Sequence, residues 1–121
     1  MKDVNKMILV GRLGGDPVKV ATTTGKDLVH FSVATSYRKK EAADQPITQW
    51  HRVVVWGNEA QAASQYLRKG NPVFVEGYLR SRNYRGKDGQ NRTTFEVHAE
   101  SVSFLGGATV HRVAEEAIQQ S

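Results

Sequence analysis

The sequence predicts an all-β fold, a five-stranded Greek-key barrel with one short helix between the third and fourth long strands. Three observations support this class. Stretches rich in β-branched and aromatic residues alternate with turn signals. One stretch with helical spacing interrupts them. The strand around residues 49–57 alternates between aliphatic and aromatic or basic side chains, a pattern typical of a strand with two different faces.

The stretch QWHRVVVWG at residues 49–57 determines which way the barrel turns its side chains. One face of this strand carries Trp50, Arg52, Val54 and Trp56, and the other carries His51, Val53 and Val55. The interior of a small barrel is filled by aliphatic residues, so we expect the face with Val53 and Val55 to point inward. The same alternation sends Val73, Val75 and Leu79 inward. Both indoles are then expected to face solvent.

The remaining elements follow from turn and cap signals. We expect strands at residues 4–14, 28–36, 73–82 and 92–106, a short extra strand at 18–24, and a polar loop at 37–48. The last strand is expected to carry a bulge near Ser101, where its alternation slips. A helix over residues 59–69 is predicted from Asn58 as N-cap, Gln61 as its capping-box partner and Gly70 as the stop. The domain should span residues 1–107, and the tail at 108–121 is expected to form a weak amphipathic helix or a frayed end.

Composition limits the class of protein. The chain has 121 residues, a formal net charge of +5, and no cysteine. This length fits one domain, and the lack of cysteine excludes disulfides and thiolate metal sites. The apolar run MILVG is too short for a signal peptide or a membrane span. We therefore expect a cytoplasmic, nucleoid-associated protein with no membrane contact, whose basic charge favours a polyanion as partner.

Aromatic and basic residues are interleaved along this chain in the way that single-stranded nucleic acid requires. Unpaired bases stack on aromatic rings, and the phosphates between them need cations at intervals. The expected stacking residues are Trp50, Trp56, Tyr84 and Tyr37. The expected phosphate-binding residues are Arg52, Arg80, Arg82, Arg85, Lys87, Arg92, Arg38 and Lys39.

The strand order is that of the oligonucleotide-binding barrel, the OB-fold, and several segments carry a more specific resemblance. In order along the chain these are VNKMILVGRLGGDP, QWHRVVVWG, YLRKGNPVFVEGYLRSRNYRGKDGQNR and FLGG. From about Val4 to Gly107 the chain resembles the bacterial single-stranded DNA-binding proteins (SSB). The resemblance implies sequence-independent binding and protection of single-stranded DNA in replication, recombination and repair, without catalysis. It also implies that Lys69, in YLRKG, is a further phosphate-binding residue, because this lysine matches a cation of the family.

The resemblance also implies an assembly. Family members are usually homotetramers that wrap DNA around the outside, which implies subunit contacts near His51, Phe74, Glu76 and Tyr78. Many members end in an acidic tip that recruits replication and repair enzymes. This sequence ends in EEAIQQS, which fits either a shortened chain or a form that naturally lacks the tip, so the resemblance alone does not predict whether such partners are recruited.

Two other binding functions fit the same fold. A primosomal OB protein of the replication-restart type would also be basic and bind single strands, although the intact QWHRVVVWG favours SSB. A protein-interaction OB module would use the aromatic face for a partner protein. The four histidines lack metal-ligand spacing and no phosphate loop or dinucleotide fingerprint is present, so no enzyme activity, metal or cofactor is expected.

Overall fold

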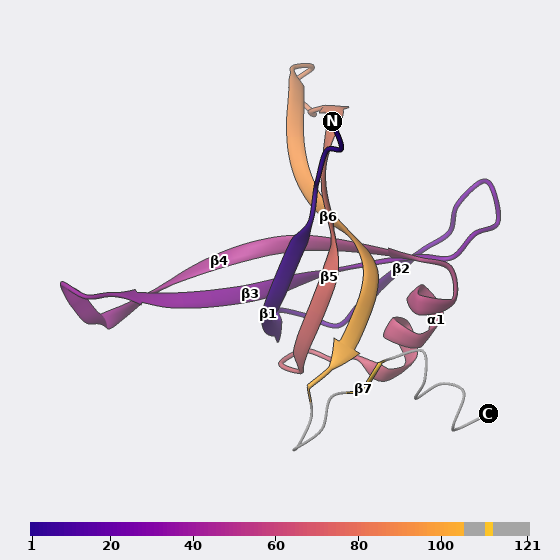
Figure 1. Cartoon of the computed structure of the whole chain (residues 1–121). Helices are drawn as coiled ribbons and strands as arrows, with labels where there is room; N and C mark the ends of the chain where they lie inside the picture. The colour runs from indigo at the N-terminus through magenta and orange to yellow at the C-terminus, as the bar shows by residue number, and fades with distance from the viewer. Residues whose placement is uncertain (106–110, 113–121) are drawn as a thin grey trace.

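The computed structural model describes residues 1–105 and 111–112, and strands dominate them. The helix and the long strands follow one another along the chain in the order that the turn signals predict (Figure 1). The elements are β1 (Met7–Leu13), β2 (Val18–Val20), β3 (Leu28–Lys39), β4 (Ala42–Trp56), α1 (Gly57–Tyr66), β5 (Pro72–Arg85), β6 (Asn91–Phe104) and β7 (His111–Arg112). The rest of the predicted tail at 108–121 lies outside the described residues, and β7 pairs with the end of β6.

Five long strands close into a barrel. Their order is β1-β5-β6-β4-β3, and a further pairing of β1 with β3 completes the circle. All the pairings in the circle are antiparallel except that of β4 with β6, where Val53 pairs with Val97. The helix α1 lies between β4 and β5, the third and fourth of the long strands. The predicted all-β barrel with one short helix is therefore confirmed.

The core consists of the aliphatic faces of these strands. Val53 and Val55 of β4 are fully buried, as are Val73 and Val75 of β5. The alanine-rich face of α1 covers one end of this core through Ala60 and Ala63. Leu67, just beyond the helix, is also fully buried. The expected inward direction of the valines is confirmed.

Leu79 is an exception, because it is 40% exposed rather than buried. β5 continues past the end of the barrel. Leu79 therefore lies on the side of the strand that faces inward, but at a position where the core has already ended. The predicted bulge is present on the neighbouring strand: the register shifts between the pairs Glu76–Ser101 and Gly77–Ala99, which leaves Glu100 as the extra residue. At this point a Cβ on Gly77 would collide with the backbone carbonyl of His98.

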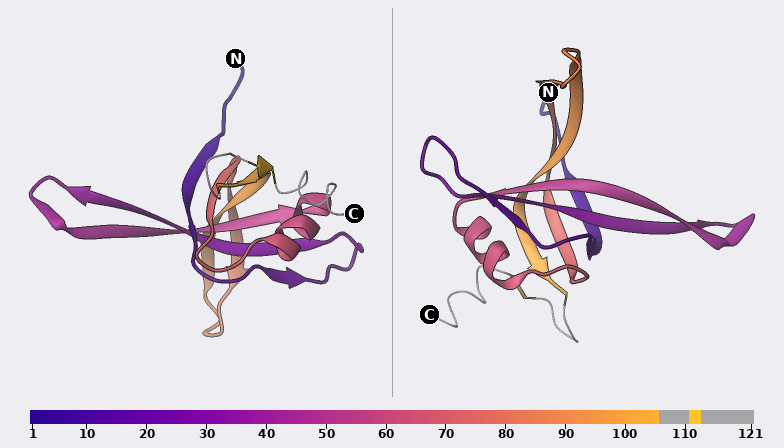
Figure 2. Two further views of the ribbon diagram at one scale, coloured as in Figure 1. Left: turned by 90° about the horizontal axis from the view of Figure 1, so that it is seen from below. Right: turned by 180° about the vertical axis from the view of Figure 1, so that it is seen from behind.

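The expected loop at residues 37–48 is wrong, because this segment forms most of a two-stranded arm. β3 and β4 remain paired from the barrel out to Lys39 and Ala42, and the side-chain hydroxyls of Ser36 and Thr48 lie 3.0 Å apart across the pair. A second arm is the paired ends of β5 and β6. Figures 1 and 2 show the two arms leaving the barrel in different directions, with α1 at the end opposite the first arm.

The ends of the helix also differ from the prediction. α1 begins at Gly57, and its N-cap is Trp56 without a side-chain hydrogen bond, so Asn58 is not the cap. Gln61 does not close a capping box, because its Nε2 donates to Asp27 Oδ2 at 2.6 Å. The helix ends at Tyr66, one turn before Gly70, since Leu67 turns into an extended conformation and enters the core.

Candidate nucleic-acid interface

The outer face of β4 presents both tryptophans to solvent. Trp50 is 63% exposed and Trp56 is 43% exposed, with Arg52 between them on the same face. The Trp50 indole lies close over Gly14, where a Cβ would meet the ring. The expected outward direction of the indoles is confirmed, but Val54 is buried, because the base of the β5–β6 arm covers the middle of β4.

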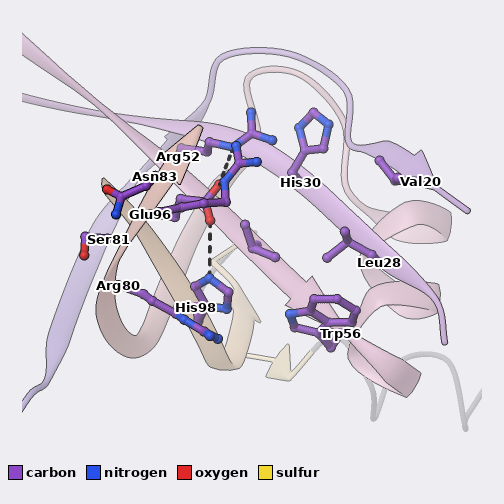
Figure 3. A pocket seen from close by; sticks show the side chains of 12 residues that line it. Val20, Leu28, His30, Arg52, Trp56, Arg80, Ser81, Asn83, Glu96 and His98 are labelled. Carbon is purple, nitrogen blue, oxygen red and sulfur yellow. Dashed lines mark hydrogen bonds and ion pairs between the residues drawn. The ribbon is translucent and has the colours of Figure 1, made fainter. Parts of the chain in front are cut away.

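Two hollows flank Arg52. The larger has a volume of about 590 Å³ and lies between β4 and the β5–β6 arm. Figure 3 shows its two kinds of wall: Trp56, Leu28 and Val20 on one side, and charged or polar side chains on the other. The smaller hollow, of about 320 Å³, contains Trp50 and also reaches Arg52. The two hollows share Arg52 and His30, so Trp50, Arg52 and Trp56 mark one path across the outer face of β4.

A buried carboxylate lies in the polar wall of the larger hollow. Glu96 accepts a hydrogen bond from Arg52 Nε at 2.9 Å and lies 3.5 Å from Arg82 Nε and 3.4 Å from His98 Nε2. Burial tends to raise the pKa of Glu96, but the bond from Arg52 and the charge of Arg82 outweigh it and lower the pKa. This carboxyl group therefore stays ionised at neutral pH.

His30 lines both hollows. Burial lowers the pKa of the His30 imidazole, and the nearby charge of Arg52 lowers it further, against a smaller opposite effect of Glu96. A histidine with a lowered pKa is neutral at pH 7. It can therefore offer one donor and one acceptor to a ligand.

The β5–β6 arm carries the next group of predicted residues. Arg80 and Arg82 line the large hollow, and the Arg82 guanidinium lies 5.8 Å from the centre of the Tyr84 ring. Tyr84, Lys87 and Arg92 line a third hollow near the tip of the arm. Arg92 is already paired with Asp88 at 2.7 Å, and Arg85 Nε donates to the Gly89 carbonyl.

The β3–β4 arm carries Tyr37, Arg38 and Lys39, and none of these three residues lines the hollows described above. Figure 2 shows this arm projecting from the barrel. The register pairs Trp50 with Ala34, so Arg38 lies on the same face of the ribbon as Trp50, whereas Tyr37 and Lys39 lie on the opposite face. All three are exposed. They do not form one cluster with Trp50 and Trp56 within a single chain.

Lys69 lies at the turn after α1, beside the smaller hollow. Its backbone N–H donates to Asp16 Oδ1 at 2.8 Å, and Asp16 lines that hollow. The Lys69 side chain is exposed. It stands at the edge of the path that begins at Trp50.

The residues expected at subunit contacts lie in three places. His51 is partly buried and hydrogen bonds to Thr35, with its Nε2 2.8 Å from Thr35 Oγ1. Phe74 and Glu76 lie on the outer face of β5, next to β1. Tyr78 stacks on His98 within the same chain, with ring centroids 5.6 Å apart.

Two groups of residues escaped the sequence analysis. Ile8 and Val10 of β1 are more than half exposed and pair with Glu76 and Phe74, so they extend the outer face of β5. Ile8 and Val10 alternate with Leu9 in the sequence, and this pattern could have identified the outer face of β1. Glu96 is the other omission. Its partner Arg52 is 44 residues away, and no local pattern marks such a contact.

Two classes of site are missing from the described part of the chain. No group of three or more His, Cys, Asp or Glu residues there is placed to hold a metal ion. No helix in residues 1–105 has the length and apolarity to cross a membrane. The three hollows are lined by aromatic rings, by arginine and lysine side chains, by His30, and by the carboxylates of Asp16, Asp88 and Glu96.

Comparisons with known proteins match this arrangement to one family. The sequence matches the Single-strand binding protein family over residues 4–105. Single-stranded DNA-binding proteins of Neisseria meningitidis serogroup A and Xanthomonas campestris are 42% identical to it, over 86% and 88% of this chain and 61% and 63% of their own lengths. The chain thus spans about three fifths of the length of these curated relatives.

The fold has a solved counterpart as well. A structure described as Plasmodium falciparum SSB complex with ssDNA superposes with a TM-score of 0.76 at 31% identity, over 87% of this chain and 97% of that one. The resemblance seen in the sequence is therefore confirmed by both kinds of comparison. This chain belongs to the single-strand binding protein family.

Proposed function

We propose that this protein binds single-stranded DNA without sequence preference and protects it during replication, recombination and repair. One observation carries the proposal: Trp50 and Trp56 are solvent-exposed on one strand face, on either side of Arg52. Exposed indoles that are not needed by the core normally belong to a binding surface. On this proposal the protein works at the nucleoid, in the cytoplasm, and needs no cofactor.

The chemistry of unpaired DNA suits such a surface. Each base stacked on an aromatic ring contributes about 1–3 kcal/mol, and every base has a face that can stack. A duplex hides these faces between its base pairs, so the surface should discriminate against it. The four aromatics Trp50, Trp56, Tyr84 and Tyr37 would stack with bases, and the predicted Lys and Arg residues would neutralise phosphates. The role is binding rather than catalysis.

The two alternatives are separable by experiment. A primosomal protein of the replication-restart type would share the strand binding, so subunit number distinguishes it: that type is dimeric. A protein-interaction module would bind a partner protein and not oligonucleotides. For the proposed function we expect oligo-dT to bind, equal-length duplex to bind far more weakly, and log K to fall with log salt at about −0.7 per phosphate contacted. Failure of oligo-dT to bind would refute the proposal.

The basic β5–β6 arm gives the first mutational prediction. Replacing Arg82 and Arg85 together with glutamine should make the salt slope shallower by up to about 1.4, that is, about 0.7 for each lost phosphate contact. The slope is measured by oligo-dT titration between low and moderate salt. Lys6→Gln with Lys19→Gln removes the same charge at residues that pair with Glu76 and Asp27 and lie off the path. That control should keep the slope, and an equal change in both variants would contradict a specific role for the arm.

We also propose that the protein assembles as a homotetramer. Support comes from the outer face of β1, where Ile8 and Val10 are exposed beside Phe74. From Met7 to Val10, β1 pairs only with β5 within the described residues, so its other edge is open to a second copy there. Symmetric contact of two such faces would bury the apolar side chains.

Light scattering after size exclusion tests this assembly. The expected mass is four times the 13.4 kDa of one chain. Val10→Glu should shift the protein to smaller species, because a carboxylate would be buried against an apolar partner face. Val18→Glu changes a valine of similar exposure on β2 and should leave the mass unchanged. A wild-type protein that elutes as a monomer at all concentrations would overturn the assembly.

A further inference from the structure

Glu96 is an anion in the middle of a face that, on the proposed function, must attract an anion. Its side chain is only 6% exposed, whereas those of its partners Arg52 and Arg82 are 41% and 55% exposed. The carboxylate comes from β6, and the two arginines come from β4 and β5. A buried charge with such partners holds groups from three strands together in one place.

Glu96 contacts both arginines through Nε, at the side of the guanidinium group rather than at its terminal Nη atoms. Arg52 reaches Glu96 Oε2 through Nε at 2.9 Å, and Arg82 reaches the same oxygen through Nε at 3.5 Å. Within residues 1–105 no hydrogen bond or ion pair given by the structure uses the terminal Nη groups of either arginine. A guanidinium has five N–H donors in a rigid fork. Each arginine therefore keeps the end of its fork available for a bidentate contact with phosphate.

We propose that Glu96 is a positioning residue for DNA binding, which fixes Arg52 and Arg82 side-on so that their terminal Nη groups point at the phosphates of the bound strand. The proposal rests on the proposed function. Long arginine side chains lose rotamer freedom when they bind a ligand. A carboxylate that already holds them removes part of that loss before DNA arrives.

The other wall of the hollow fits the same arrangement. Trp56 lies across the hollow from Arg52 and Glu96, with Leu28 beside it (Figure 3). A nucleotide whose base stacks on Trp56 would place its backbone toward the polar wall. His98, which also contacts Glu96, is held in turn by its stacking on Tyr78. The carboxylate is thus supported on the side away from the arginines.

Two possible roles of Glu96 predict opposite changes in DNA affinity when its charge is removed. If Glu96 were only a negative charge near DNA, Glu96→Gln would raise the local positive charge and tighten binding. If Glu96 positions the arginines, the same variant loosens two phosphate contacts and weakens binding despite the gain in charge. The sign of the change in affinity therefore decides between the two roles.

The experiment is an oligo-dT titration of the wild type and Glu96→Gln over a range of salt. We expect the variant to bind at least fivefold more weakly, with a salt slope shallower by about 0.7 to 1.4, for one or two lost phosphate contacts. Glu100→Gln is the matched control, because it makes the same charge change at an exposed position on the same strand. It should bind as tightly as the wild type or slightly more so, with the slope unchanged.

A double-mutant cycle tests whether Glu96 acts through Arg52. Once Arg52 is glutamine, adding Glu96→Gln should weaken binding by a smaller factor than it does in the wild type. Additive losses, or a Glu96→Gln variant with wild-type affinity and slope, would overturn the positioning role while leaving the proposed function intact. A wild-type protein that fails to bind oligo-dT overturns both.

The wild type gives a second test if circular dichroism shows that Glu96→Gln does not fold. The Nε–H proton of Arg52, which is hydrogen-bonded to Glu96, should exchange slowly with solvent in NMR spectra, both in free protein and with oligo-dT bound. Fast exchange in the complex would mean that Arg52 leaves the carboxylate to reach DNA, which contradicts the proposal.

Discussion

Replacement of both Trp50 and Trp56 by alanine is expected to weaken oligo-dT binding by roughly 30-fold or more. Each stacked base contributes about 1–3 kcal/mol, and a tenfold change in affinity corresponds to about 1.4 kcal/mol. The two rings lie in separate hollows on either side of Arg52, so their contributions should be nearly additive. Each single replacement should then lose about half of the total free energy.

The measurement is fluorescence anisotropy of a labelled oligonucleotide, since the variants lack the tryptophans that would otherwise report binding. Phe95→Ala is the matched control. Phe95 is also exposed, but alternation on β6 places it on the opposite face from Glu96, and Phe95 does not line the large hollow. This control should bind like the wild type. Wild-type affinity in the double variant would mean that DNA does not lie along this face of β4.

The face of β4 was predictable because it depends on local alternation alone. A strand in the wall of a barrel has one face inside and one face outside, and the face with Val53 and Val55 was the aliphatic one. The same reasoning located the bulge near Ser101, where alternation slips. The strand order then indicated a closed barrel, because the helix falls between the third and fourth long strands.

The arms were harder to predict because burial gives no pattern there. Most of the described side chains on both faces of the β3–β4 arm are exposed, so its polar residues resemble a loop although they are paired as strands. Leu79 shows the converse error. Its alternation with Val75 is correct, but the strand has already left the barrel, and periodicity cannot tell where the core ends.

The contact of Glu96 with Arg52 was invisible for a different reason. It joins two strands that are far apart in the sequence and adjacent only because β4 pairs with β6 in parallel. An acid in the stretch FEVHAE has no local feature that distinguishes a buried charge from a solvated one. The pairing of β4 with β6 has to be known before the contact between Glu96 and Arg52 can be predicted.

Leu67 should be the most sensitive aliphatic residue in the fold, and its replacement by alanine should lower the free energy of unfolding by about 2–5 kcal/mol. It is the largest of the fully buried side chains and packs with the alanines of α1 at the end of the barrel. A domain of this size is stable by about 5–15 kcal/mol. The loss should lower the melting temperature by on the order of 10 °C.

Thermal unfolding at fixed protein concentration measures this loss, and Leu79→Ala provides the comparison. Leu79 is the same residue type on the β5–β6 arm, but its removal leaves no cavity because its side chain already meets solvent. Its replacement should change stability by less than about 1 kcal/mol. Equal shifts for the two variants would contradict the packing of Leu67 against α1. Because Leu67→Ala removes neither a ring nor a cation, the folded variant should keep the wild-type salt slope, which separates loss of fold from loss of the binding face.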